Sequence, residues 1–563
     1  MKRRSFLKSI AGAGAFAALS TRLQPLLAKP VAVQSPLALN PLRIPQVITG
    51  GKLSVAQTTF KIFPDTDATV FSINNSIPGP TIKLKKGDTF TAKITNNLAE
   101  ETVIHWHGLH VRAAMDGHPK NAIAPGSSFD VNYPIIQRAG TFFYHSHANM
   151  KTARQTYLGM SGCFIIEDDE ELALGLPSGE FDIPLLIQDK RFDSGKQLEY
   201  DPKDSDMLGG WLGDTILVNG TPNAFLTVAQ TMYRFRLING SNARVYKIAL
   251  AGGGSFTIIG NDGGLLEKPV VASSAMLAPA ERLDIVIDFS SQPFGTAFSL
   301  QSLAFSFGGS AGSGSVPQGA ALDLLQFQID RTGTPGNPLP SVLSTITKYD
   351  IADSVRTRTY ELNSSISGHY INFKNYDLNT IDQHVKFGDL EQWSFINESE
   401  QIHPMHVHGT QFQVLDRDGS PPEAYEMGWK DVIRLDSSGR VNVLVRFAEY
   451  TGVYLVHCHN LEHEDMGMMA NFQVESTGGV SEEEAALGAL TITPNPASVR
   501  ATLSFPPLAR ESLLQITDDK GALQFSTMLP PEFESYELVT SHFAAGSYFV
   551  SIGGRRAKLV IVH

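Results

Sequence analysis

Histidine and cysteine gather in one short stretch of this 563-residue chain, YLVHCHNLEHEDMGMM at residues 454–469. Cys458 lies there between His457 and His459, and the sequence contains only one other cysteine, Cys163. On a β-strand, residues i and i+2 point to the same face, so the two histidines would face one way and Cys458 the other. Thiolate and imidazole are both ligands of transition metals. The stretch therefore predicts two metal sites on opposite faces of one strand.

The His-x-His spacing occurs in two copies of one local design. AGTFFYHSH at 139–147 matches TGVYLVHCH at 451–459, and TVIHWHG at 102–108 matches HPMHVHG at 403–409. The four pairs are His105/His107, His145/His147, His406/His408 and His457/His459. Bringing the two copies face to face would place these eight imidazoles around one pocket, enough for three metal ions. Imidazole suits copper, zinc, iron and nickel, so the pairs alone do not select the metal.

The residues expected around Cys458 indicate which metal is bound there. Its sulfur would meet His403 and His463, and Met468 lies ten residues further along, favoured over its two methionine neighbours by its spacing from the cysteine. Two histidines, one cysteine and a weak axial methionine form a blue-copper electron-transfer site, whereas zinc normally takes four strong ligands. The first copy of the design lacks all of these ligands, having in their places Thr102, Ser146, Lys151 and Thr156. The sequence thus predicts one blue-copper site beside a cluster shared by both copies.

The motifs HWHG (105–108), HSH (145–147), HPMHVHG (403–409) and HCHNLEHEDMGM (457–468) resemble those of three-domain multicopper oxidases, over roughly residues 45–475. The resemblance implies four copper ions, which oxidise a reductant one electron at a time and reduce O2 to water. It assigns a type 1 copper to His403, Cys458, His463 and Met468, a type 2 copper to His105 and His406, and a type 3 pair to His107, His145, His147, His408, His457 and His459. Asp116 and Glu464 match acidic positions to which the family assigns proton delivery.

The substrate class is open between two branches of that family. GTQFQVLDRDGSPP (409–422) and GWKDV (428–432) resemble bacterial laccases and cuprous oxidases. Ser399 and Gln401 stand where cuprous oxidases carry an acid and a methionine, and soft thioethers are what would hold Cu(I). We therefore expect a laccase-like enzyme acting on phenols or aromatic amines, with a cuprous oxidase for copper tolerance as the alternative. A copper-binding electron carrier is an alternative of another class, against which the eight cluster histidines argue.

Short alternating segments punctuated by turns predict an all-β fold. With the resemblance, they predict three cupredoxin-like Greek-key β-sandwich domains and a small C-terminal β-sandwich. The expected domains span residues 45–170, 180–335 (copper-free, since it contains no histidine) and 345–475, followed by a linker at 476–488 and the terminal domain at 489–563.

Both ends of the chain carry export features. MKRRSFLKSI and the apolar stretch after it resemble a twin-arginine signal peptide, expected to span residues 1–28. TITPNPAS (491–498), with the closing KLVIVH, resembles the C-terminal sorting domain of type IX secretion, with a β-sandwich accessory module as the alternative. We expect a monomer exported to the periplasm, surface or surroundings of a Gram-negative bacterium by the twin-arginine and outer-membrane machineries.

The remaining candidates are weaker. Loss of residues 1–28 takes the net charge from −12 to −17, which argues against nucleic acid as a partner. Cys163 lies in an apolar run and is predicted to be a small core residue. The histidines without partner spacing are predicted to be ordinary surface residues; they are His110, His118, His369, His384, His542 and His563.

Overall fold

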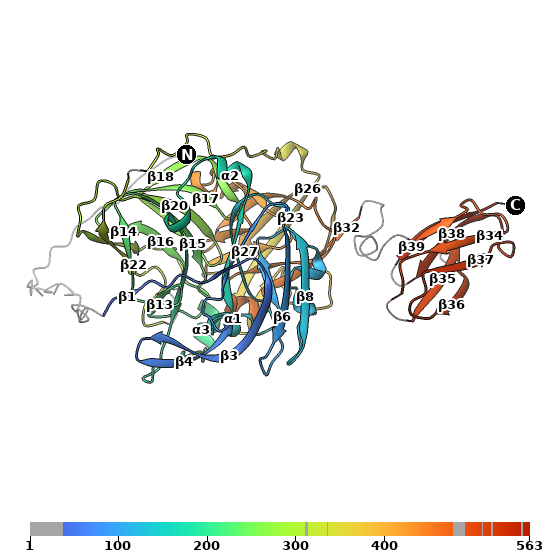
Figure 1. Cartoon of the computed structure of the whole chain (residues 1–563), viewed down its shortest axis with the longest axis horizontal. Coiled ribbons are helices and arrows are strands. Elements are labelled where there is room, and N and C mark those ends of the chain that lie inside the picture. Colours follow the sequence, from blue (N-terminus) through green and yellow to red (C-terminus); the bar gives the residue numbers. More distant parts are fainter. Residues whose placement is uncertain are drawn as a thin grey trace, which may run out of the picture. The chain divides into compact units, whose positions relative to one another are not determined.

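The structure is a computed structural model that describes residues 38–309, 314–334, 336–476, 490–508, 511–518, 522–552 and 555–562. The predicted signal at 1–28, almost all of the predicted linker and His563 lie outside these residues. Strands dominate the described part and pack as paired sheets, so the predicted all-β fold is confirmed (Figure 1). None of the helices described there is long and apolar enough to cross a bilayer.

The first sandwich pairs a sheet in the order β4-β3-β6-β8 with one in the order β2-β5-β10-β9-β7. Its strands are β2 (Val47–Ile48), β3 (Gly51–Phe63), β4 (Thr66–Ile73), β5 (Thr81–Lys85), β6 (Thr89–Asn96), β7 (Ile104–His107), β8 (Ser128–Pro134), β9 (Gly140–Ser146) and β10 (Ser161–Glu167). β6 alternates exposed and buried residues, as TFTAKITN predicts. Trp106 and the neighbouring aromatic rings of Phe90 and Tyr144 fill the core between the sheets.

The second sandwich pairs sheets in the orders β13-β12-β11-β15-β20-β17-β18 and β1-β14-β22-β21-β16-β19. Its strands are β1 (Asn40–Pro41), β11 (Asp182–Lys190), β12 (Thr215–Val218), β13 (Thr221–Pro222), β14 (Ala224–Ala229), β15 (Met232–Asn239), β16 (Tyr246–Leu250), β17 (Phe256–Asn261), β18 (Gly264–Ala272), β19 (Ser274–Leu277), β20 (Arg282–Asp288), β21 (Ala297–Ser302) and β22 (Leu322–Arg331). Although β1 precedes the first sandwich in sequence, it pairs with β14 and extends the second.

The third sandwich pairs sheets in the orders β24-β23-β26-β30-β28 and β25-β32-β31-β27-β29. Its strands are β23 (Arg356–Ser365), β24 (Gly368–Ile371), β25 (Gln383–Lys386), β26 (Leu390–Asn397), β27 (His403–Val407), β28 (Phe412–Arg417), β29 (Val432–Leu435), β30 (Arg440–Arg446), β31 (Gly452–Cys458) and β32 (Met469–Glu475). Cys458 and Met468 belong to the core of this sandwich.

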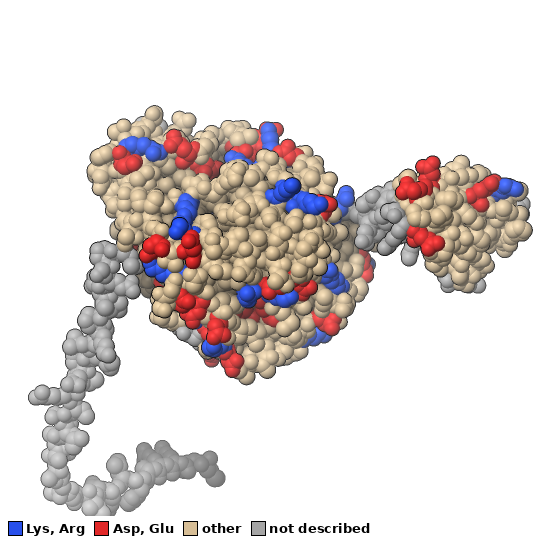
Figure 2. Space-filling view, turned by 60° about the horizontal axis from the view of Figure 1, so that its bottom comes forward, with Lys and Arg blue, Asp and Glu red and all other residues tan. Residues whose placement is uncertain are grey.

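Short helices fill the connections. The α-helices are α1 (Thr152–Tyr157), α2 (Asp169–Ala173), α3 (Asp204–Gly209) and α4 (Leu461–Asp465), and the 3₁₀ turns are η1 (Ala113–Met115), η2 (Pro119–Asn121), η3 (Gly179–Phe181), η4 (Ile351–Asp353) and η5 (Ala424–Glu426). A buried apolar cluster joins the first three sandwiches where Cys163 meets Leu186 and Val432, so Cys163 is the core residue expected. On the face seen in Figure 2, acidic and basic side chains are interspersed.

The C-terminal part has its own core and pairs sheets in the orders β33-β34-β37 and β36-β35-β38-β39. Its strands are β33 (Thr491–Thr493), β34 (Arg500–Ser504), β35 (Ser512–Asp518), β36 (Leu523–Leu529), β37 (Ser535–Val539), β38 (Gly546–Ile552) and β39 (Arg555–Ile561). This segment is thus a β-sandwich with an apolar interior.

Candidate metal centres

Two antiparallel strand pairs bring the His-x-His motifs together. In the first sandwich β7 lies beside β9, with His105 opposite His145. In the third, β27 lies beside β31, with His406 opposite His457. Because alternate residues of each strand face one side, every motif presents two imidazoles to the boundary between the sandwiches.

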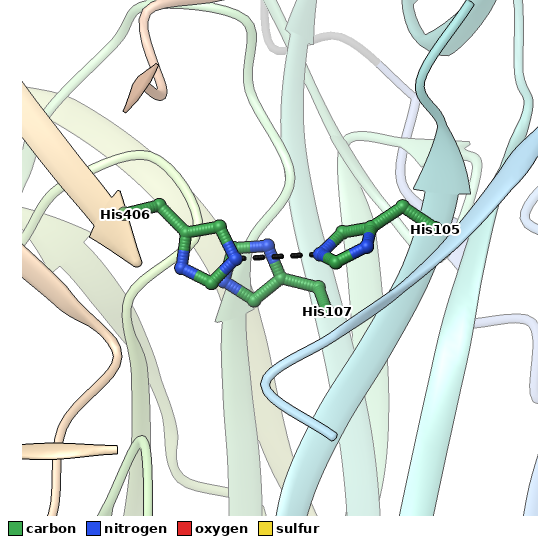
Figure 3. A group of neighbouring side chains, drawn as sticks. All are labelled: His105, His107 and His406. Atoms are coloured by element: carbon green, nitrogen blue, oxygen red, sulfur yellow. Dashed lines mark hydrogen bonds between the residues drawn. The ribbon is translucent and has the colours of Figure 1, made fainter. Parts of the chain in front are cut away.

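Across this boundary the ring nitrogens converge in separate groups. In the first group, His105 Nε2 lies 3.3 Å from His406 Nε2, and the ring of His107 stacks on that of His406 (Figure 3). In the second group, His145 Nε2 lies 3.3 Å from both His107 Nδ1 and His459 Nε2. All five residues are buried.

The third group is built around His457. Its Nε2 atom lies 3.3 Å from His147 Nε2 and 3.0 Å from His408 Nε2. The eight rings therefore form three groups of converging nitrogens, and His107 lies close to two of these groups. The family resemblance assigns His105 and His406 to a type 2 copper and the other six to a type 3 pair.

The outer nitrogens of His105 and His406 donate to backbone carbonyls. His105 Nδ1 donates to the carbonyl of Asp116 at 2.6 Å, and His406 Nδ1 donates to the carbonyl of Asp431 at 2.8 Å. Since a carbonyl only accepts, the ring proton lies on Nδ1, and the facing Nε2 atoms both carry lone pairs. Two lone pairs 3.3 Å apart repel one another unless a cation lies between them. The residues present therefore fit a metal.

Burial favours the neutral form of His105, His145 and His406. It lowers the pKa of His145 to about 3 and the pKa values of His105 and His406 well below the ordinary value of a histidine. A neutral imidazole is the form that binds a metal, so the cluster is ready to bind at neutral pH without first losing protons.

On the opposite face of β31, a second site surrounds Cys458. Its Sγ lies 3.4 Å from His403 Nδ1 and 3.7 Å from His463 Nδ1, and the two nitrogens are 3.1 Å apart. His403 Nε2 donates to Ser399 Oγ at 2.8 Å and His463 Nε2 to the Leu208 carbonyl at 3.0 Å, so both Nδ1 lone pairs face the sulfur. Two nitrogens and one sulfur form a trigonal set suited to copper.

The backbone brings Met468 next to Cys458 in the core of the third sandwich. The Cys458 N–H donates to the Met468 carbonyl at 3.0 Å, and both side chains are buried. The Asn460 N–H donates to the Cys458 Sγ at 3.4 Å. Burial raises the pKa of the Cys458 thiol, so a thiolate there needs the positive charge of a metal.

The first sandwich has no such site at the equivalent place. Thr102 Oγ1 and Ser146 Oγ both donate to Gln155 Oε1, at 2.7 and 2.5 Å. A hydrogen-bonded polar cluster thus fills the position, which agrees with the loss of ligands expected from the sequence.

Three segments match family models described as multicopper oxidase, at residues 54–171, 190–310 and 338–478. The chain belongs to the multicopper oxidase family. It is 36% identical to the multicopper oxidase mco of Staphylococcus aureus over 409 residues, which cover 71% of this chain and 83% of that protein. It is 31% identical to a laccase of Bacillus subtilis over 503 residues, covering 78% of this chain and 96% of the laccase.

Among solved structures, the multicopper oxidase McoA of Aquifex aeolicus superposes with a TM-score of 0.72 at 35% identity. The match covers 78% of this chain and 100% of that one. This oxidase is therefore a copper-dependent oxidoreductase with O2 as electron acceptor.

Both predicted proton-delivery residues of the oxidase lie against cluster histidines. Asp116 Oδ2 accepts from His408 Nδ1 at 2.7 Å, and its buried Oδ1 has no hydrogen-bond partner among the described residues. Glu464 lies 3.3 Å from His147 Nδ1 and 3.2 Å from His457 Nδ1. Burial raises the pKa of Asp116 well above its ordinary value.

A third carboxylate, that of Asp431, lies at the cluster and was not predicted from the sequence. Its carboxylate accepts from His107 Nε2 at 3.1 Å while its carbonyl accepts from His406. Arg282 of the second sandwich holds this carboxylate through two hydrogen bonds of 2.6 and 2.5 Å. A lone acid in the run KDVIRL has no spacing relation to the histidines, so only the fold brings them together.

The prediction that the unpaired histidines lie on the surface is wrong for two of them. His118 is buried and its Nε2 bonds to the Asn471 side chain at 2.9 Å. His369 is fully buried and stacks on His463, with ring centroids 3.9 Å apart. His110 is largely covered, with 13% of its side chain exposed, whereas His384 is exposed as expected.

Proposed function

We propose that this enzyme is a laccase-like oxidase, which oxidises phenols or aromatic amines in one-electron steps and reduces O2 to water. The observation that carries the proposal is the buried His403–Cys458–His463 site, joined through β31 to the histidine cluster. An electron carrier needs only the first of these sites. The exposed Glu398 and Glu400, on either side of Ser399, favour organic or cationic reductants.

The proposal includes four copper ions. The type 1 ion would be held by His403, Cys458, His463 and Met468, the type 2 ion by His105 and His406, and the type 3 pair by His107, His145, His147, His408, His457 and His459. Copper bound there would supply one-electron oxidation at the first site and reduction of O2 at the cluster.

The chain's own residues link the two metal sites and deliver protons to the cluster. Cys458 is bonded through the backbone to His457 and His459, so the two sites are covalently continuous. Reduction of O2 to water consumes protons, and we assign their delivery to Asp116 and Glu464, which lie within 3.3 Å of cluster imidazoles. The raised pKa of Asp116 suits a group that carries a proton near neutral pH.

A cuprous oxidase is the second candidate, and the second sandwich provides the observation that favours it. Helix α3 places the carbonyl of Met207 against His369 and that of Leu208 against His463, and the type 1 histidine His463 is fully buried. Met207 is half-buried on this helix, its backbone carbonyl bonds to His369, and a thioether is the kind of soft ligand that Cu(I) prefers. The proximity of Met207 to the type 1 site could not be predicted from the sequence, because Met207 lies some two hundred residues before the ligands.

Oxygen uptake by the copper-loaded protein separates the two candidates. A methoxyphenol and Cu(I) are supplied in parallel, with no other copper added, and Met207→Leu is measured beside the wild type. Uptake with the phenol alone supports the laccase. Uptake that needs Cu(I), and that falls in Met207→Leu, supports the cuprous oxidase. No uptake with either reductant contradicts both.

Export is also proposed. Residues 1–28 would direct the folded enzyme through the twin-arginine machinery, and the β-sandwich at 489–563 would act as a type IX sorting domain. The mature monomer would then lie in the periplasm, on the surface or outside a Gram-negative cell. Fractionation of cells that produce the full chain, Arg3→Lys/Arg4→Lys, or a chain ending at residue 476 tests this. Unchanged location of both altered chains contradicts it.

A further inference from the structure

We propose that His369 is a positioning residue of the type 1 site, which holds the ring of His463 by face-to-face stacking and ties the site to the second sandwich. This inference rests on the type 1 assignment made under the proposed function. None of the motifs that carry the family resemblance contains His369, which lies in the hairpin formed by β23 and β24.

The stacking is close and buried. The rings of His369 and His463 have centroids 3.9 Å apart and planes inclined by 24°. His403, the other type 1 histidine, lies edge-on to His369 with centroids 6.5 Å apart. Because all three rings are excluded from solvent, His463 cannot rotate without displacing His369.

Both nitrogens of His369 have hydrogen-bond partners. Nε2 donates to the Met207 carbonyl at 3.0 Å, so Nδ1 carries the lone pair and accepts from Ser364 Oγ at 2.8 Å. Ser364 Oγ also lies 3.4 Å from His403 Nε2. One serine therefore links His369 to the second type 1 histidine.

Helix α3 accepts one hydrogen bond from each of the two stacked rings. His369 Nε2 bonds to the carbonyl of Met207, and His463 Nε2 bonds to the carbonyl of the next residue, Leu208. Two consecutive carbonyls of the second sandwich thus fix two rings of the third. Asn375 also restrains the backbone at His369, because its side-chain amide donates to the carbonyls of His369 and Met466.

Removing the stacked ring should loosen His463 and weaken its hold on copper. Residues that orient metal ligands typically change metal affinity or activity by roughly 10-fold to 100-fold when they are replaced. The cluster histidines lie on the opposite face of β31, so the effect should be confined to the type 1 site.

The test uses the copper-loaded full chain and the variants His369→Ala, His369→Phe and Ser364→Ala, with the exposed His384→Ala as control. We measure the blue absorption band, its rate of loss in a chelator, and the type 1 reduction potential. We expect His369→Ala to lose type 1 copper roughly tenfold faster or more. His369→Phe keeps a flat ring but loses both hydrogen bonds, and should fall between His369→Ala and the wild type.

Each outcome bears on one claim. A wild-type protein that binds copper without a blue band contradicts the type 1 assignment itself. A blue wild type whose His369→Ala variant has the same band, potential and copper retention overturns the role of His369, even if its melting temperature falls. If His369→Ala does not fold, unchanged retention and potential in both His369→Phe and Ser364→Ala overturn the role equally.

Discussion

Acid should unfold the copper-free protein far more readily than the copper-loaded protein. Burial lowers the pKa of His145 and His403 to about 3 and the pKa of His118 and His369 to about 4. In the unfolded chain each of these histidines titrates near 6.5. Between these values the unfolded state binds protons that the folded state does not, so stability is fully present above pH 6.5 and is lost as the pH falls.

The magnitude follows from proton linkage. One such histidine changes the free energy of unfolding by about 1.4 kcal/mol per pH unit, so the four together change it by about 5 kcal/mol per unit. A folded protein is stable by about 5–15 kcal/mol in total. The copper-free protein should therefore unfold within about one to three units below pH 6.5. Copper-loaded protein should resist to lower pH, because unfolding must also release the metal.

The assay follows tryptophan fluorescence and circular dichroism of both forms from neutral pH downward. His118→Gln should reduce the slope of the free energy of unfolding against pH by about 1.4 kcal/mol per unit. The exposed His384→Gln is the matched control and should leave the slope unchanged. Equal acid midpoints for the copper-free and copper-loaded forms would show that protonation of the buried histidines does not drive unfolding, and so would equal slopes for His118→Gln and the wild type.

Two further substitutions test the cluster and its support. Asp116→Asn cannot carry a proton, so kcat for O2 reduction should fall by roughly 10²–10⁴. Anaerobic bleaching of the blue band should keep its rate, and an equal loss in both measurements would contradict the assignment. Arg282→Met leaves Asp431 buried without its partner and should lower the free energy of unfolding by about 3–5 kcal/mol. In denaturant titrations the exposed Lys196→Met, which breaks a surface ion pair with Asp65, should lose at most about 1 kcal/mol, and similar losses would contradict the buried-pair argument.

The sequence predicted the sites best where ligands lie close together along the chain. A His-x-His pair on a strand presents both imidazoles to one face, so the gathering of the eight histidines from the two copies around one cluster was predicted. Residues contributed singly by distant elements carry no such pattern. Asp431 and His369 reach the sites only through the packing of separate strands, and Met207 reaches one through a helix of another sandwich.

Fold class was likewise accessible from local pattern, as the alternation along β6 illustrates. The burial of His118 was not, because its environment comes from Asn471, more than three hundred residues away in the chain. The pairing of β1 with the second sandwich was also not predictable, because a strand of two residues has too short a hydrophobic pattern to indicate its partner.

Copper content and visible absorption of the wild type and Cys458→Ser, measured beside oxygen uptake, are the decisive test of the copper sites. We expect four coppers and a blue band in the wild type. We expect Cys458→Ser to lose the blue band and substrate oxidation while the cluster keeps its copper. A Cys458→Ser protein that stays blue, or that still oxidises substrate at the wild-type rate, would show that Cys458 does not hold a type 1 copper.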